Sequence, residues 1–296
     1  MPVFNLMQVD AFTSKPLLGN PCAVVLDADA LSEETMLKIA RELNLPETAF
    51  VLHSTMADFD VRFFTPAEEI PLAGHPTIAT TFALVETGRV KLTGGYTVIT
   101  LGLSVGPIQV EIHARKNEPL LLVMSQKKPE FRRTYEHSEV LRIFGLSEED
   151  ALPDVPLRTV STGTPQLMIP LRSLRALRKA KLDIEAYERF RASADFFSPH
   201  LFCLQGVTAE GQTFARHFGV PPDLPEDPFT GSATGGMAAY IWHYNLIEQP
   251  TFVAEQGHWM NRPGKAIVEV VGPRNDISTV KIGGNAVTVL RGQLLL

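Results

Sequence analysis

The sequence predicts an α+β protein made of two similar, strand-rich halves that each wrap one helix. The chain has 296 residues, which suits two units of about 150 residues each. A nine-residue segment occurs twice, at residues 69–77 and 226–234, with Glu, Pro, Gly and Thr at matching positions. Each copy follows an Arg-x-Phe segment and leads into a run that is apolar nearly all round, which predicts a buried helix.

The first half, residues 1–128, is predicted as a series of strands interrupted by two helices. Ser32 is a good N-cap, and apolar residues recur after it at helical spacing, which predicts a helix that ends near residue 44. The apolar helix after the first motif copy covers residues 78–86. The predicted strands cover residues 4–12, 22–26, 49–52, 58–64, 96–101, 108–113 and 120–124.

A charged, proline-containing segment at residues 127–156, with one short helix at 140–144, marks the boundary between the halves. The second half, residues 129–296, appears in the same order as the first, with helices at 184–190 and 237–244. Its last strand is free to cross back to the first half. The predicted strands cover residues 157–161, 167–170, 201–204, 213–218, the vicinity of 253, 267–271, 280–282 and 286–290.

The composition excludes several classes of protein. A net charge of −6 and a pI near 5.8 argue against a nucleic-acid or anionic-membrane partner. No apolar stretch approaches the ~20 residues of a membrane helix, and no signal peptide is apparent, which predicts a cytoplasmic protein. Cys22 and Cys203 have neither metal-ligand nor disulfide spacing, and no glycine-rich nucleotide motif is present. We therefore expect no metal and no cofactor.

The repeated motif predicts an anion site. A Pro and a Gly before a helix let the chain turn sharply, and the first-turn amides lie at the positive end of the helix dipole. Two such helix ends in similar halves indicate a site between the halves that holds a carboxylate. The alternative is that Pro-x-x-Gly is only a turn and that His75 or Ser232 is only a helix cap. The repetition in matching context favours the site.

Three ionisable residues near the motif copies are candidates for acid/base chemistry. A carboxylic acid in a desolvated site, as Glu47 would be before an apolar strand, has a raised pKa and exchanges protons near neutral pH. The alternatives are a solvated turn carboxylate for Glu47, a helix-dipole partner for Asp227, and a structural buried histidine for His75. Taken singly, these alternatives are favoured; their joint placement around two helix ends favours catalysis.

Several blocks carry a family resemblance. Asn44-Leu45-Pro46-Glu47-Thr48-Ala49-Phe50 and Glu226-Asp227-Pro228-Phe229-Thr230-Gly231-Ser232-Ala233 are the most specific. Together with residues 9–13, 19–21, 64–66, 74–76, 160–163, 255–257 and 262–264, they resemble, in order, the PhzF-like phenazine-biosynthesis family. The resemblance spans nearly the whole chain. It implies the diaminopimelate-epimerase-like fold, in which each half is a mostly antiparallel sheet curled around a central helix and the active site lies between the halves.

The resemblance also implies a function. It implies cofactor-independent isomerisation by proton transfer on a small, carboxylate-bearing metabolite that is amino acid-like and possibly cyclic, by a homodimer. Glu47 would carry the proton, His75 would position or share one, and Asp227 would orient an amine or act as a second acid/base. The substrate would be bound by Gly74, Thr230, Gly231 and Ser232.

Two positions depart from the family pattern and bear on the substrate more than on the fold. Pro46 stands where the family often has Ser, and Gln166 stands where a His often follows the Thr-Gly-Thr-Pro turn. Epimerases of the superfamily place a catalytic cysteine before each helix-entry glycine, where this chain has Ala73 and Thr230. Two-thiol racemisation is therefore not expected.

Two other functions remain open from the sequence. One is a metabolite-binding protein without catalysis that keeps the same anion cleft. The other is a thiol-dependent epimerase that uses Cys22 or Cys203, which alkylation would inactivate.

Overall fold

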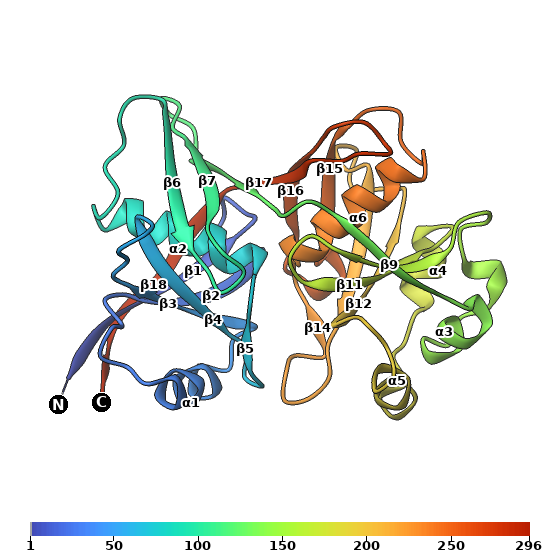
Figure 1. The fold of residues 1–296 in the computed structure, drawn as a ribbon, viewed down its shortest axis with the longest axis horizontal. Helices are drawn as coiled ribbons and strands as arrows, with labels where there is room; N and C mark the ends of the chain where they lie inside the picture. The colour runs from blue at the N-terminus through green and yellow to red at the C-terminus, as the bar shows by residue number, and fades with distance from the viewer. Residues whose placement is uncertain (1) are drawn as a thin grey trace.

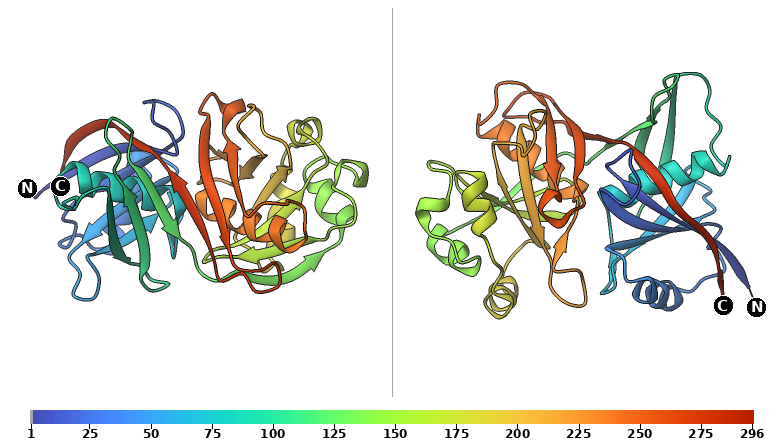
Figure 2. Two further views of the ribbon diagram at one scale, coloured as in Figure 1. Left: turned by 90° about the horizontal axis from the view of Figure 1, so that it is seen from above. Right: turned by 180° about the vertical axis from the view of Figure 1, so that it is seen from behind.

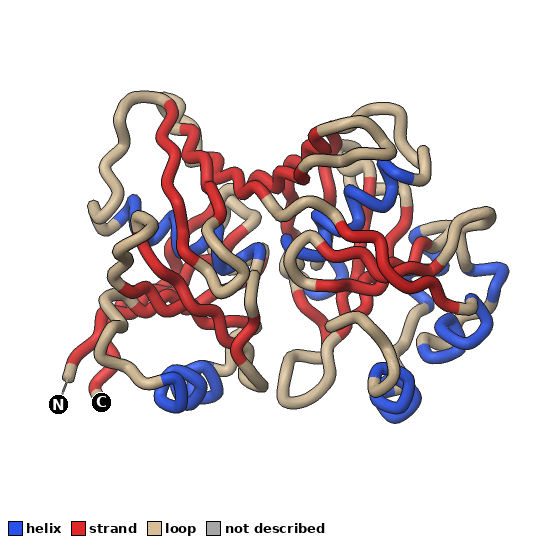
Figure 3. Tube along the Cα trace, viewed as in Figure 1, coloured by secondary structure: helices blue, strands red, loops and turns tan. Residues whose placement is uncertain are grey.

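The computed structural model describes residues 2–296, which form two halves side by side. Figure 1 shows the halves with the two chain ends next to each other on one of them. Each half contains one central helix, α2 (Gly74–Glu86) in the first and α6 (Gly231–His243) in the second. Strands surround both helices (Figure 3), and both helices are almost entirely buried. Their lack of a polar face is the reason, because neither helix could be stable at the surface.

In the first half, seven strands follow one another across the sheet in chain order. The neighbours pair antiparallel, parallel, antiparallel, parallel, antiparallel and antiparallel. The short strand β5 (Glu69–Ile70) pairs with β4 beside this series. The seven strands are β1 (Val3–Ala11), β2 (Asn20–Val25), β3 (Glu47–Leu52), β4 (Phe59–Phe64), β6 (Tyr96–Gly102), β7 (Ile108–His113) and β8 (Leu121–Ser125).

The second half repeats this series with the same six pairings in the same order. The short strand β14 (Glu226–Asp227) pairs with β13 as β5 pairs with β4. The internal repeat predicted from the motif is therefore present in the strand pairing as well. The seven strands are β10 (Leu157–Ser161), β11 (Pro165–Pro170), β12 (Ser198–Cys203), β13 (Thr213–Phe218), β15 (Thr251–Gln256), β16 (Gly264–Val271) and β17 (Thr279–Gly284).

The halves exchange their last strands. β9 (Glu130–Tyr135) follows the first half in sequence but pairs with β10, and β18 (Ala286–Leu295) follows the second half but pairs with β1. Between these crossings, β8 and β17 pair antiparallel and join the two sheets. Figures 1 and 2 show both crossing segments between the halves. The relative position of the halves is thus fixed by backbone hydrogen bonds as well as by side chains.

The other helices cover the outside of the sheets. α1 (Glu33–Leu43) packs over β3 and β4, and its predicted cap is present, since Ser32 Oγ accepts from the Thr35 amide at 3.3 Å. The second half carries α3 (His137–Ile143), α4 (Leu174–Lys179) and α5 (Ile184–Arg191) over a separate apolar cluster. Within residues 2–296, no helix combines the length and the apolar character needed to cross a membrane.

The repeat extends to individual side chains. Arg62 of β4 forms a two-pronged ion pair with Glu69, and Arg216 of β13 forms the same pair with Glu226 at 2.9 and 2.7 Å. At the start of α2, Thr77 Oγ1 donates to the Ala73 carbonyl at 2.7 Å. At the start of α6, Thr234 Oγ1 donates to the Thr230 carbonyl at 2.9 Å. Both motif copies therefore build the same turn into a buried helix.

The structure corrects three details of the sequence prediction. The central helices begin at Gly74 and Gly231, several residues before the predicted starts at 78 and 237, because the motif itself forms the first turn. β9 lies in the segment predicted as a charged boundary; most of its side chains are exposed, so it has no apolar alternation to reveal it. The short helix α4 was also missed.

Candidate active site

The N-termini of the two central helices meet at the junction of the halves. A Cβ atom added to Gly74 would lie 2.5 Å from the Ser232 amide nitrogen and 2.6 Å from the Gly231 Cα, so only glycine permits this approach. Neither N-cap residue, Ala73 or Thr230, caps its helix with a side-chain hydrogen bond. Two positive helix ends therefore face one small region without side-chain caps, which favours an anion there.

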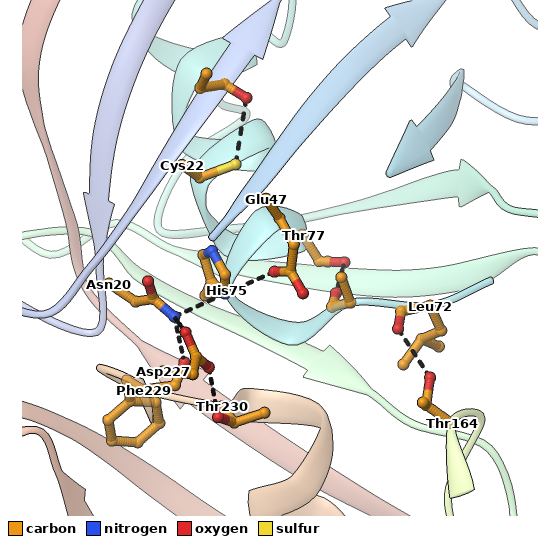
Figure 4. A network of polar contacts seen from close by, with 12 residues as sticks. Asn20, Cys22, Glu47, Leu72, His75, Thr77, Thr164, Asp227, Phe229 and Thr230 are labelled. Atoms are coloured by element: carbon orange, nitrogen blue, oxygen red, sulfur yellow. Dashed lines mark hydrogen bonds and ion pairs between the residues drawn. The ribbon is translucent and has the colours of Figure 1, made fainter. Parts of the chain in front are cut away.

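Glu47 faces this region from the first half. It is the first residue of β3, not part of a solvated turn, and its side chain is 18% exposed. Its Oε2 lies 2.9 Å from Nδ1 of His75, which occupies the first turn of α2 and is 2% exposed. Figure 4 shows the carboxylate and the imidazole directed toward each other. The interpretation of His75 as a helix cap is therefore wrong, because its ring bonds away from the helix.

Asn20 connects His75 to the second half. Its Nδ2 lies 2.7 Å from Oδ1 of Asp227, 2.8 Å from the Phe229 carbonyl and 2.9 Å from His75 Nδ1. An amide nitrogen has two hydrogens, and it donates them to the first two partners, the Asp227 carboxylate and the Phe229 carbonyl. Both hydrogens are thus committed to these acceptors, and His75 is left to pair with the Glu47 carboxylate (Figure 4). A series of polar contacts therefore spans the two halves, and it runs from Glu47 through His75 and Asn20 to Asp227.

Asp227 is held by its own turn. Thr230 Oγ1 donates to Asp227 Oδ2, so this hydroxyl serves the carboxylate instead of capping α6. Gln256, from the end of β15, donates to the Asp227 carbonyl at 2.7 Å and accepts from the Thr230 amide at 3.1 Å. One bond therefore holds the Asp227 carboxylate, and two others hold the backbone of the turn that carries it.

The electrostatics of the group favour shared protons. Burial alone would lower the pKa of His75, but the nearby carboxylates of Glu47 and Asp227 raise it above its ordinary value. Burial, the larger effect, raises the pKa of Asp227; the nearby His75 opposes this, and the Glu47 charge adds to it. The buried imidazole is thus stabilised as a cation between two carboxyl groups, one of which holds its proton more firmly than a free aspartate does.

A cleft opens beside this group between the halves. Its volume is about 160 Å³, close to that of an engineered cavity of ~150 Å³ that holds one benzene molecule. Glu47 and Leu72 line it from the first half, and Asp227, Thr230 and Ser232 line it from the second. The cleft therefore suits a ligand built on one small ring or a short chain.

The structure brings all seven candidate site residues together at this junction. The helix-cap interpretation fails for Ser232 as for His75, because the N-cap of α6 is Thr230. Sequence reasoning assigned no role to Asn20 or Gln256, although both lie in blocks that carry the family resemblance. Their position in those blocks was the available signal; their partners lie more than 25 residues away and could not be read from the sequence.

The cysteines lie in strands, as predicted, and both are buried. Burial raises the pKa of Cys203 to about 11, and burial together with the nearby Glu47 raises that of Cys22 well above its ordinary value. Neither thiol has the lowered pKa that a catalytic cysteine requires. Among residues 2–296, no group of three His, Cys, Asp or Glu side chains is arranged to hold a metal ion.

Two strand-rich halves with a cleft between them beside facing helix ends define an epimerase-like fold. The chain belongs to the phenazine biosynthesis-like protein family, whose model matches residues 9–292. The solved structure of a PhzF-family phenazine biosynthesis protein from Bacillus anthracis matches it with a TM-score of 0.87 and 31% identity, over 100% of both chains. The predicted fold class and family are confirmed.

Curated relatives are similar over nearly their full length. An uncharacterized isomerase of Clostridium acetobutylicum is 32% identical, over 99% of this chain and 98% of its own. The trans-2,3-dihydro-3-hydroxyanthranilate isomerase of Pseudomonas fluorescens is 31% identical, over 99% of both chains. The prediction of an isomerase of the PhzF type is therefore confirmed at the level of reaction class.

Proposed function

We propose that the protein is a cofactor-independent isomerase that moves a proton between two carbons of a small carboxylate-bearing metabolite. Glu47 removes a proton from one carbon, and the electron pair of that bond shifts into the substrate. The same proton, or one exchanged with it, is then returned to another carbon. No electron leaves the substrate and no group is transferred, so the step balances without a co-reactant.

The observation that carries this proposal is the position of the Glu47 carboxylate, 2.9 Å from a buried histidine, beside two uncapped helix ends. The helix ends would hold the substrate carboxylate through the amides near Gly74 and Gly231, with Ser232 and Thr230 beside them. A carboxylate fixed there next to the proton carrier is what a proton transfer within one small molecule requires.

The other two ionisable residues would support the transfer. His75, which pairs with Glu47 at 2.9 Å, would stabilise the carboxylate before it takes the proton and would share the proton afterwards. Asp227, with its raised pKa, would orient a substrate amine or serve as the second acid/base. The substrate class that fits the cleft volume is an amino acid-like molecule with one small ring.

Deuterium exchange tests the proposal. The protein is incubated in deuterated water with a panel of small cyclic and acyclic amino acids, trans-2,3-dihydro-3-hydroxyanthranilate included, and carbon-bound deuterium is followed by NMR and mass spectrometry. We expect label at carbon with the wild type and labelling slowed by roughly 100-fold or more with Glu47→Gln. If compounds bind but none is labelled, the proposal is wrong and a binding protein is the better account. The homodimer and the cytoplasmic location stay predictions; light scattering tests the first.

A further inference from the structure

A chain of four buried polar side chains in the second half ends at the cleft. Nδ1 of His200 lies 3.3 Å from Nδ1 of His217, and Nε2 of His217 lies 2.8 Å from Ser198 Oγ. Ser198 Oγ lies 2.7 Å from Oε1 of Gln166, which lines the cleft opposite Glu47's half. The chain crosses three adjacent strands, β11, β12 and β13, and the residue opposite His217 in the next strand is Asp227.

Both imidazoles in this chain are neutral. Burial lowers the pKa of His217 to about 3, and burial together with the neighbouring ring lowers that of His200 well below its ordinary value. Each ring therefore has one N–H donor and one bare acceptor nitrogen. The hydroxyl of Ser198 has a single hydrogen, so the whole chain can run in two directions only.

The direction of the hydrogen bonds is selected by the free-energy cost at His200, the end of the series that lies away from the cleft. Nε2 of His200 is buried and has no hydrogen-bond partner among residues 2–296. If the chain ran from Gln166 toward His200, this nitrogen would carry an orphaned N–H, which buried structure rarely tolerates. In the opposite direction it is a bare acceptor, which costs less. His200 Nδ1 then donates to His217, His217 Nε2 donates to Ser198, and Ser198 donates to Oε1 of Gln166.

In this direction the side-chain carbonyl of Gln166 accepts from Ser198, and its NH2 group remains free to donate to a ligand. Nε2 of Gln166 makes no hydrogen bond with any residue from 2 to 296, and Gln166 lines the cleft at a residue exposure of only 2%. A neutral donor that is held in one orientation and faces a cleft lined by the carboxylates of Glu47 and Asp227 is suited to a neutral oxygen acceptor. A second carboxylate on the ligand would be repelled by those charges.

We propose that Gln166 determines substrate specificity by donating from its NH2 group to a hydroxyl or carbonyl oxygen of the substrate. His200, His217 and Ser198 are positioning residues that fix which face of the amide meets the cleft. This rests on the proposed function and deepens it. The substrate then has a carboxylate, which binds at the two helix ends, and a separate neutral oxygen, which accepts a hydrogen bond from Gln166.

Binding of unreactive ring compounds tests the contact. Calorimetry compares 2-aminobenzoates that carry a hydroxyl at ring position 3, 4 or 5 with the matching methyl compounds. We expect the hydroxyl compound to bind roughly tenfold more tightly at one position. Gln166→Leu should reduce that ratio to within about twofold, and Gln109→Leu, a matched change on an exposed strand face, should preserve it. A ratio near one at every position in the wild type, or an unchanged ratio in Gln166→Leu, would overturn the proposal.

The direction of the hydrogen bonds from His200 to Gln166 can be measured separately. Long-range proton–nitrogen NMR on imidazole-labelled protein reports which ring nitrogen carries the hydrogen. We expect His217 to be protonated at Nε2 and His200 at Nδ1. Protonation of His217 at Nδ1 would turn the Gln166 carbonyl toward the cleft and refute the assignment. These experiments use no turnover, so they fail or succeed independently of the deuterium exchange that tests the proposed function.

Discussion

Replacing Gly74 by Ala should separate the two helix ends. The new Cβ would lie 2.5–2.6 Å from three backbone atoms of Gly231 and Ser232, whereas ordinary contact begins near 3.4 Å. Backbone cannot rotate away as a side chain can, so the halves must move apart by about 1 Å. Overpacking of this kind costs roughly 1–3 kcal/mol. A displacement of about 1 Å at reacting groups costs on the order of 100-fold in rate.

The assay combines thermal unfolding with the rate of deuterium uptake. At about 2–4 °C per kcal/mol for a chain of this size class, the melting temperature should fall by roughly 2–12 °C. Uptake should fall on the order of 100-fold. Gly95→Ala is the matched control, because its Cβ would meet only the Ala114 carbonyl at 3.5 Å. A Gly74→Ala variant with the melting temperature of the wild type and an uptake rate within about threefold of it would contradict the proposed importance of the contact between the helix ends.

Three further predictions concern the groups around this contact. Asn20→Leu removes two buried hydrogen-bond donors and should lower the free energy of unfolding, measured in urea, by about 2–4 kcal/mol. The control, Asn5→Leu at an exposed position, should change it by less than about 0.5 kcal/mol. Equal effects of the two substitutions would contradict the hydrogen bonds assigned to Asn20. Folding raises the pKa of His75 above 6.5, so its contribution to stability is complete below that pH and is lost as pH rises through the folded pKa. The unfolding free energy of the wild type minus that of His75→Asn should therefore be constant below pH 6.5 and fall as the pH rises above it, and a flat difference would refute the pKa assignment. Native protein should resist alkylation at Cys22 and Cys203 and keep its activity in iodoacetamide; inactivation of folded protein would support a thiol mechanism instead.

The sequence predicted those features that repeat or that depend on local pattern. The motif copies at 69–77 and 226–234 located both central helices, because proline, glycine and an apolar run act within a few residues. The cap at Ser32 was predicted for the same reason. The crossing of β9 was not predicted. That of β18 was left open, because its pairing with β1 spans more than 100 residues and no local pattern encodes such a pairing.

The same distinction applies to the site. Glu47, His75 and Asp227 were predicted as a group because each lies beside a motif or a conspicuous turn in the sequence. The role of Asn20 was not predicted, because it depends on a donor that reaches a carboxylate 207 residues away. The chain from His200 to Gln166 was likewise hidden, since it exists only where three strands lie side by side.

The claim at the centre of this account is that Glu47 carries the proton. The most direct measurement is the rate of deuterium uptake at carbon by Glu47→Gln, relative to Glu68→Gln, on a compound that the wild type labels. Glu68 lines the same cleft but is exposed, so its variant controls for the loss of one negative charge. We predict a fall of roughly 100- to 10,000-fold for Glu47→Gln and a change within about threefold for Glu68→Gln. Equal rates in the two variants, with both proteins folded, would contradict the assignment.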